Sequence, residues 1–165
     1  TPYEALDIFF QEYQLNKKDK VVDFGCGRGR VAFYIHNRFH IPVTGVEVIE
    51  ETYEQAIQNK TAYLENNQHI GAPIHFHSGP AEDYKVRPAD NRFYFFNPFS
   101  IHIFRKVVRN ILESIKERSI DIILYYPMPE YELYLKRSTP LKLIKEVRLP
   151  ETDDNYDKFL VYRYD

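Results

Sequence analysis

A short apolar segment that runs into an acidic residue and three alternate glycines constrains this chain more than any other feature. The stretch is Val21-Val22-Asp23-Phe24-Gly25-Cys26-Gly27-Arg28-Gly29-Arg30. Strand-forming residues come first and a helix-like pattern begins near Gly29, which predicts a strand, a glycine loop and a helix N-terminus in succession. Glycine tolerates positive φ and lets a ligand lie against bare backbone, so this succession is typical of a nucleotide-binding corner in α/β proteins.

The spacing of the glycines separates two kinds of nucleotide-binding corner. The dinucleotide fingerprint, G-x-G-x-x-G, needs glycine at position 30, or at position 32 if it starts from Gly27. The chain has Arg30 and Ala32 there. What is present is D-x-G-x-G-x-G, with Asp23 before the first glycine, and a carboxylate there suits a ligand with a positive group. A glycine-rich turn without a ligand is the alternative.

This stretch resembles motif I of the class I S-adenosylmethionine-dependent methyltransferases, whose cofactor carries an ammonium and a sulfonium. The resemblance implies S-adenosyl-L-methionine as the cofactor, methyl transfer (EC 2.1.1.-) as the reaction and a Rossmann-like fold. It also implies cofactor contacts from Asp23, Gly25, Cys26, Gly27 and Gly29. Cys26 is the only cysteine of the chain, which excludes an internal disulfide and a cysteine-built zinc site. We interpret Cys26 as a small filler of the loop rather than a nucleophile.

Length and composition limit the class of protein to which this chain can belong. A chain of 165 residues with 44% apolar residues suffices for one domain with an adequate core, so we expect residues 1–165 to form a single domain. Because the first residue is Thr1 and not Met, we expect a trimmed chain that native N-terminal residues precede. The sequence has no signal-peptide pattern or run of membrane-spanning length, and with the lone cysteine this favours the cytoplasm and no membrane partner. A net charge of −2 gives no global field that attracts nucleic acid.

Hydrophobic periodicity predicts strands that alternate with helices and a strand pair at the end. The expected helices cover residues 3–14, 29–39, 51–67, 101–115 and 130–137. The expected strands cover residues 20–24, 43–48, 74–77, 93–96, 120–126, 141–149 and 158–164, with a hairpin loop at 151–155. This order indicates an α/β fold with a doubly wound, mostly parallel, seven-stranded sheet and helices on both faces. The methyltransferase resemblance implies that the final strand is antiparallel.

Glu47 stands near the end of the second expected strand. An acidic residue at this place can accept hydrogen bonds from both ribose hydroxyls, and a solvated strand-end charge is the alternative. Val48 and Ile49 follow, and they either pack on an adenine face or belong to the core.

The segment after the third expected strand is the part of the chain that we expect to contact the adenine. Many methyltransferases have an Asp-Ala pair here, with the acid near the adenine amino group, and this chain has Pro80 where that Asp would fall. The resemblance implies that the backbone of Ala81 and Glu82 edges the adenine. Glu82 or Asp83 then replaces the missing acid.

Asn97-Pro98-Phe99 follows the fourth expected strand and looks like a shortened Asn-Pro-Pro-aromatic motif. That motif marks methyltransferases that act on amino groups of adenine, guanine or glutamine side chains. The resemblance implies that Asn97 faces the methyl group, and that its side-chain oxygen and a backbone carbonyl accept hydrogen bonds from the amine. It also implies that the aromatic ring of Phe99, which follows Pro98, stacks on a planar substrate. One proline of the motif is missing, and Asn97 as a simple cap of the helix near Ser100 is the alternative.

These patterns leave three functions open. The first is methyl transfer to a nitrogen of a nucleic-acid base or a protein amide, with RNA, DNA and protein all open as the acceptor. The second is a small-molecule methyltransferase, and the third is a non-catalytic module that binds S-adenosyl-L-methionine without turnover. His75 and His77 alternate on one expected strand, but no third or fourth ligand has suitable spacing, so we expect no metal.

Overall fold

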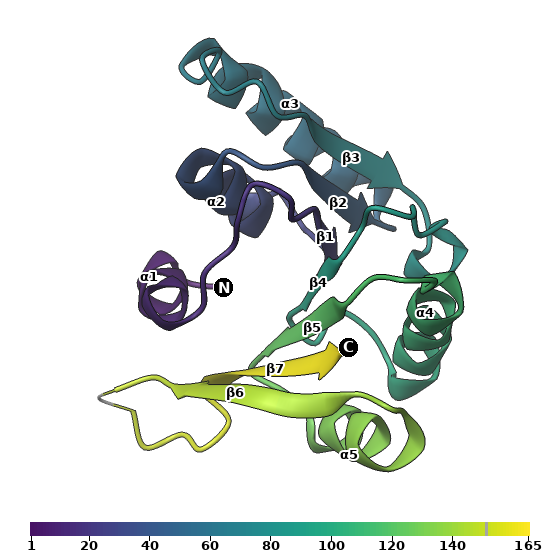
Figure 1. Cartoon of the computed structure of the whole chain (residues 1–165). Helices are drawn as coiled ribbons and strands as arrows, with labels where there is room; N and C mark the ends of the chain where they lie inside the picture. Colours follow the sequence, from purple (N-terminus) through teal and green to yellow (C-terminus); the bar gives the residue numbers. More distant parts are fainter. Residues whose placement is uncertain (151) are drawn as a thin grey trace.

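A seven-stranded mixed sheet forms the centre of the structure (Figure 1). The computed structural model describes residues 1–150 and 152–165. The strand order is β3-β2-β1-β4-β5-β7-β6. The strands are β1 Val21–Phe24, β2 Val43–Glu47, β3 Ile74–Ser78, β4 Arg92–Phe95, β5 Ile120–Tyr125, β6 Lys142–Arg148 and β7 Lys158–Tyr164. Strands β1 to β5 pair in parallel, and β7 pairs antiparallel with β5 and with β6, so the predicted fold class is confirmed.

Helices cover both faces of this sheet (Figure 1). On one face lie α1 Tyr3–Glu12, α2 Arg30–Phe39 and α3 Glu50–Glu65, and on the other lie α4 Ile101–Ser114, α5 Pro129–Ser138 and the short 3-10 helix η1 Ala81–Asp83. All five expected helices are present, with ends that differ from the predicted ones by a few residues. None of the helices in the described part of the chain has the length and apolar character that a membrane crossing requires.

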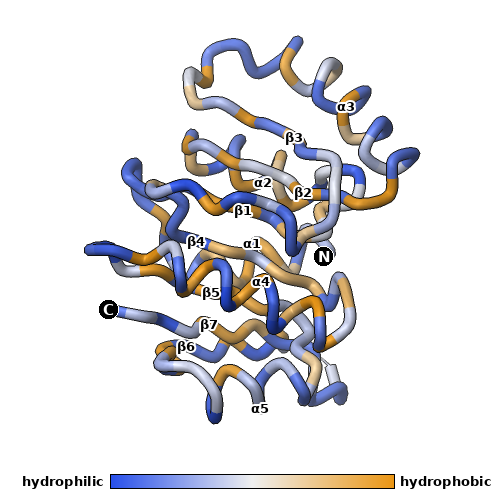
Figure 2. Tube along the Cα trace, turned by 90° about the vertical axis from the view of Figure 1, so that its right-hand side faces the viewer, coloured by the Kyte–Doolittle hydropathy of each residue, from blue (hydrophilic) through white to orange (hydrophobic). Residues whose placement is uncertain are grey.

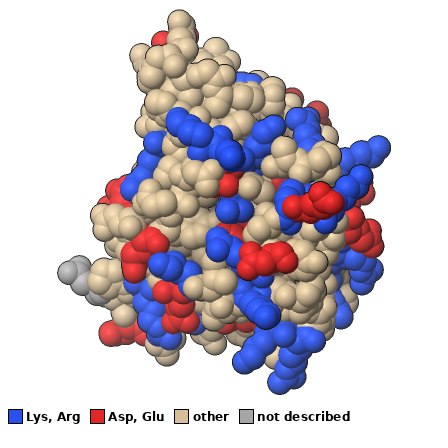
Figure 3. All heavy atoms as spheres, in the orientation of Figure 1, with Lys and Arg blue, Asp and Glu red and all other residues tan. Residues whose placement is uncertain are grey.

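Alternate residues of the central strands enter two separate cores. Val21 of β1 packs with α1 and α2, whereas Val22 packs with α4, because successive side chains of a strand point to opposite faces. Every residue of β5 is buried, which explains its almost continuous apolar run. Figure 2 shows orange, hydrophobic residues along these middle strands and blue, hydrophilic residues along much of the outer loops. On the face drawn in Figure 3, Lys and Arg side chains are interspersed with Asp and Glu.

A buried carboxylate ties distant parts of the chain together. Asp121 of β5 is fully buried and accepts hydrogen bonds from the Tyr13 hydroxyl at 2.5 Å and from Arg163 Nε and Nη2 at 2.7 and 2.9 Å. Arg92 Nε of β4 lies 3.4 Å from the same carboxylate. The segment after α1, the strands β4 and β5, and the last strand β7 therefore meet at one negative charge.

The predicted hairpin loop at 151–155 connects β6 to β7. Glu151 lies outside the described residues. Asp154 Oδ1 accepts a hydrogen bond from the Tyr156 backbone N–H at 2.9 Å, and a bend of the chain at 155–156 leads into β7.

Replacement of Asp121 tests this network. Asp121→Ala should lower the free energy of unfolding by roughly 3–5 kcal/mol, because two guanidinium groups and a phenol lose a buried partner. Urea denaturation measures the change. Asp153→Ala, at an exposed carboxylate, is the matched control and should change stability by less than about 0.5 kcal/mol. Equal effects of the two substitutions would contradict a structural role for the buried network.

Candidate active site

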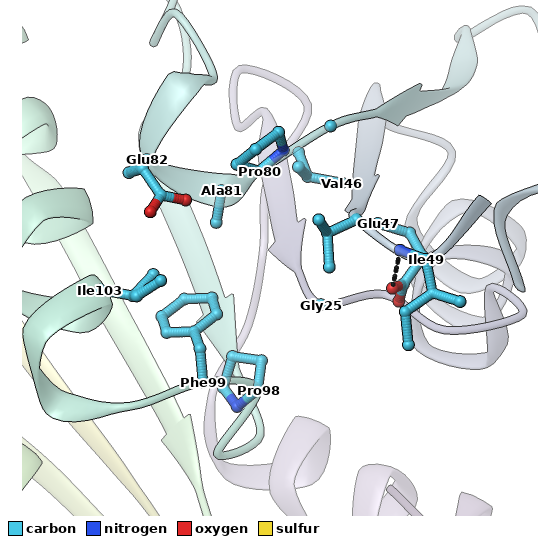
Figure 4. A pocket seen from close by; sticks show the side chains of 12 residues that line it. Gly25, Val46, Glu47, Ile49, Pro80, Ala81, Glu82, Pro98, Phe99 and Ile103 are labelled. Carbon is cyan, nitrogen blue, oxygen red and sulfur yellow. Dashed lines mark hydrogen bonds between the residues drawn. The ribbon is translucent and has the colours of Figure 1, made fainter.

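A cavity of about 450 Å³ opens at the carboxyl ends of β1, β2, β3 and β4 (Figure 4). This volume is in the range of sites for cofactors and other small molecules. Eight of the residues singled out in the sequence line it: Gly25, Glu47, Val48, Ile49, Ala81, Glu82, Pro98 and Phe99. Figure 4 shows Pro98, Phe99 and Ile103 on one side of the cavity and Glu47 and Ile49 on the other.

The glycines of the loop after β1 have different functions. Gly25, at φ +72°, lies so close to the segment after β4 that a Cβ would stand 2.2 Å from Pro98 Cβ. A Cβ on Gly27, at φ +57°, would meet nothing within 4 Å. Gly29 is the N-cap of α2, and a Cβ on it would stand 2.6 Å from the Phe33 ring. Gly25 thus permits a close approach of two loops, Gly27 leaves open space beside the backbone, and Gly29 serves helix packing.

Glu47 holds the glycine loop against the end of β2. It is only 7% exposed, so the alternative of a solvated strand-end charge is wrong. Its Oε1 accepts a hydrogen bond from the Gly27 N–H at 2.9 Å, and its Oε2 accepts one from the Ile49 N–H at 3.0 Å. Each carboxylate oxygen can accept a further hydrogen bond, so Glu47 still has acceptor capacity toward the cavity it lines.

Asp23 is a buried carboxyl whose charge the described residues compensate only weakly. It is 3% exposed and does not line the cavity. Burial raises its pKa to about 8, and the nearby Glu47 carboxylate adds to this shift. Among the described residues no side chain or backbone group donates a hydrogen bond to it. A bound cation would stabilise the ionised form of such a carboxyl, and a cofactor that bears an ammonium group provides such a cation.

Apolar groups flank the remainder of the cavity. Val48 and Ile49 are 61% and 59% exposed, so they belong to the cavity wall and not to the core. On the opposite side, Ala81 and the half-buried Glu82 come from η1, and the Glu82 carbonyl accepts a hydrogen bond from Asn110 Nδ2 at 2.8 Å. Exposed apolar side chains in the cavity wall suit a flat ring such as adenine.

Sequence reasoning missed part of this wall. Val46, Gly79, Pro80 and Ile103 also line the cavity. Ile103 lies in the first turn of α4, and nothing in the sequence marked it as part of the wall. Pro80 contributes an apolar surface to this wall.

Asn97 lies beside a second, smaller cavity. That cavity has about 120 Å³ and is lined by Asn97, Tyr126, Pro127, Met128, Pro129 and Tyr156. The Asn97 backbone has φ +39°, its Nδ2 donates a hydrogen bond to the Tyr126 carbonyl, and its Oδ1 is buried without a partner among the described residues. Ser100 caps α4 by accepting a hydrogen bond from the Ile103 N–H at 3.5 Å, so Asn97 as the helix cap is wrong.

Cys26 is in the loop but not in the cavity wall. It is 8% exposed, and its Sγ would lie 2.8 Å from a Cβ on Gly45 of β2. Burial raises the pKa of the Cys26 thiol, which disfavours the thiolate. Within the described part of the chain, no three His, Cys, Asp or Glu residues come close enough to hold a metal ion.

Comparison with known proteins identifies the family. Residues 21–118 match the family model described as "Methyltransferase domain". A search of curated proteins found no significant match. An RNA methyltransferase from Salinibacter ruber, solved with S-adenosyl-L-homocysteine, is 14% identical with a TM-score of 0.67, and the match covers 99% of this chain and 91% of that one.

Two further structures share the fold. An rRNA methylase from Streptococcus thermophilus is 16% identical with a TM-score of 0.63, over 99% of this chain and 96% of that one. A precorrin 8w decarboxylase from Methanobacterium thermoautotrophicum is 16% identical with a TM-score of 0.66, over 100% and 91% of the two chains. The family match covers more than half of the sequence and agrees with the strand order and the glycine loop. The chain therefore belongs to the methyltransferase domain family and is an S-adenosyl-L-methionine-dependent methyltransferase of the class I fold.

Proposed function

We propose that this methyltransferase acts on a nitrogen atom of an acceptor held at the carboxyl ends of β4 and β5. The observation that carries the proposal is the segment Asn97-Pro98-Phe99. Pro98 and Phe99 line the larger cavity, and Asn97 borders the smaller one, so the segment stands between them. The unpaired Asn97 Oδ1 costs about 1–3 kcal/mol as a buried acceptor, and an N–H donor from an acceptor molecule would satisfy it.

Cofactor contacts follow from the larger cavity. S-adenosyl-L-methionine, when bound, supplies an electrophilic methyl group on a sulfonium. Glu47 has lone pairs for the ribose hydroxyls, and Gly27 leaves room beside the backbone. Asp23 offers a buried carboxyl to the cationic end, and Val48 and Phe99 offer apolar surfaces to the adenine.

Asn97 positions the acceptor nitrogen in this proposal. Its amide is held by the bond from Nδ2 to the Tyr126 carbonyl. Oδ1 would accept a hydrogen bond from the acceptor N–H and so direct the nitrogen lone pair toward the methyl group.

The proposal also concerns the chemical class of the methyl acceptor. The motif resemblance favours an amino group of a nucleic-acid base or a protein amide, and two of the similar structures are described as RNA methyltransferases. A small-molecule acceptor is the second candidate, because a protein described as a precorrin decarboxylase has the same fold. Radiolabelled methyl transfer to RNA, DNA, protein and metabolite fractions separates these classes, and no transfer to any fraction would favour a non-catalytic module.

Gly27→Val tests the cofactor contacts. The new side chain enters open space, so the chain should fold, at a cost of about 1–3 kcal/mol for a branched residue at positive φ. Binding of S-adenosylhomocysteine, measured by calorimetry, should be lost because the side chain occupies the ligand's path. Gly71→Val also adds a side chain in open space but far from the site, and it should bind normally. Normal binding of S-adenosylhomocysteine by Gly27→Val would contradict the assignment of Gly27 to the cofactor site.

Asp23 predicts a pH dependence of cofactor affinity. A cation bound beside the carboxyl, whose pKa burial raises to about 8, favours the carboxylate and lowers that pKa. Affinity for S-adenosyl-L-methionine should therefore rise between pH 6 and pH 8, by up to about tenfold per pH unit, and then level off. Calorimetry over this range measures the slope, which should disappear in Asp23→Asn together with tight binding.

The same carboxyl gives an independent check on stability. The folded-state pKa of Asp23, about 8, lies above its unfolded value near 4. The stability that the protonated Asp23 gives the fold is therefore fully present below about pH 4 and is lost as the pH rises through about 8. Thermal melts of Asp23→Asn should lack this loss. A cofactor affinity that does not change with pH in the unaltered protein would contradict the role of Asp23.

Asn97→Ala tests the acceptor position. If Asn97 directs the nitrogen, the substitution should lower kcat by on the order of 10²-fold with little change in S-adenosylhomocysteine affinity. Ser100→Ala is the matched control, because Ser100 is the cap of α4: it should cost about 1 kcal/mol in a thermal melt and leave turnover unchanged. Unchanged turnover in Asn97→Ala would remove the nitrogen-directed role and leave the cofactor assignment standing.

A further inference from the structure

Negative charge is concentrated at the reaction edge of the sheet. The edge consists of the loops and first helical turns after β1, β2, β3, β4 and β5, together with the loop before β7. Its described carboxylates are Glu50, Glu51, Glu82, Asp83, Glu130, Glu132, Asp153, Asp154 and Asp157. Its cations include Arg28 and Arg30 after β1 and, at the facing ends of β6 and β7, Arg148 and Lys158, which lie 2.6 and 4.0 Å from carboxylate oxygens of Glu146. A polyanion that approaches this edge is repelled, and a polycation is attracted.

Two tyrosines form an aromatic wall at the acceptor side of this edge. Tyr126 and Tyr156 have ring centroids 6.3 Å apart at an interplanar angle of 44°, and both line the smaller cavity beside Asn97. Tyr156 is 46% exposed. Because the negative face of an aromatic ring attracts cations, this wall adds to the attraction of the nearby carboxylates.

One carboxylate holds the aromatic wall in place. Asp154 accepts a hydrogen bond from the Tyr126 hydroxyl and, at 2.9 Å, one from the Tyr156 backbone N–H. The hydrogen bond from Tyr126 lowers the pKa of Asp154, so the group stays ionised near neutral pH. The wall therefore combines two ring faces with a fixed negative charge. Both rings line the same small cavity as Asn97, whose side-chain Oδ1 has no partner among the described residues.

We propose that the acceptor nitrogen belongs to a basic polypeptide segment, rich in Lys or Arg, that lies across this acidic edge. The segment's cationic side chains contact the Tyr126–Tyr156 wall and the carboxylates of the loop before β7, and its acceptor nitrogen reaches Asn97. This inference rests on the proposed transfer of methyl to nitrogen. Within that function it selects protein over nucleic acid, because phosphates placed along the same edge would face Asp153, Asp154 and Asp157.

A single introduced tryptophan gives a direct binding test. The chain contains no Trp, so Tyr156→Trp places one fluorescent reporter in the wall. A synthetic peptide of alternating Lys and Gly with one central Gln should change its emission saturably at low salt, and a single-stranded adenine-rich oligonucleotide should not. Leu143→Trp, at a half-exposed position of β6 remote from the edge, is the matched control and should respond to neither probe. A response to the oligonucleotide alone, or equal responses at both reporters, would overturn the inference.

Charge reversal on the edge tests the electrostatic part. Added to the Tyr156→Trp reporter, Asp153→Lys should weaken peptide binding by about 3–10-fold at low salt, and by less as salt rises. Glu117→Lys makes the same charge change in the exposed segment before β5, at the opposite edge, and should change peptide affinity less than about twofold. Unchanged or tighter peptide binding in Asp153→Lys would count against the proposal.

Methyl transfer separates this inference from the proposed function. Tyr156→Ala should raise KM for the peptide by about 3–10-fold with kcat and S-adenosylhomocysteine affinity unchanged, and Tyr156→Phe should restore KM because the ring face is retained. Label that appears in RNA and not in basic peptides would overturn the inference and leave transfer to nitrogen intact. If the unaltered protein does not bind S-adenosylhomocysteine, the proposed function itself would be overturned.

Discussion

The contact between Gly25 and Pro98 determines how the two halves of the site are arranged. Their strands, β1 and β4, are neighbours in the sheet, with Phe24 opposite Phe95, so the loops that follow them leave the sheet side by side. A Cβ on Gly25 would stand 2.2 Å from Pro98 Cβ, so only glycine allows this approach. The approach brings Pro98 and Phe99 to the larger cavity at the ends of β2 and β3, and Asn97 lines the smaller cavity. A side chain at position 25 would displace Pro98 from the wall of the larger cavity.

Most of the fold could be predicted because its signals are local. The continuous apolar run of β5 and the helical stripe of α4 are properties of adjacent residues, and both elements appear where the sequence predicts them. The network around Asp121 could not be predicted, since Tyr13 and Arg163 lie 108 and 42 residues away from it in the sequence. The antiparallel direction of β7 came from the family resemblance and not from the residue pattern, because an isolated strand pattern does not encode its direction.

The site was predicted in its residues more than in its contacts. The position of Glu47 after β2 was visible in the sequence, but its two hydrogen bonds to the N–H groups of Gly27 and Ile49 depend on how the glycine loop turns back. The capping of α4 by Ser100 rather than Asn97 could not be predicted, because Asn and Ser are both good N-cap residues and both stand just before the helix. Tyr126 and Tyr156 carried no signal, because their proximity to Asn97 requires the pairing of β5 with β7.

The place of β7 in the sheet also governs the order in which the protein can form during synthesis. β7 lies between β5 and β6, although it is made after both. A ribosome that has released the chain only through β6 therefore exposes a β5 strand with one unpaired, apolar edge, and the guanidinium of Arg163 has not yet reached Asp121. Such an edge is a template for pairing with other chains. Contacts of long sequence separation close slowly, so this nascent state persists until β7 inserts, and it is the stage at which a chaperone would find the exposed strand.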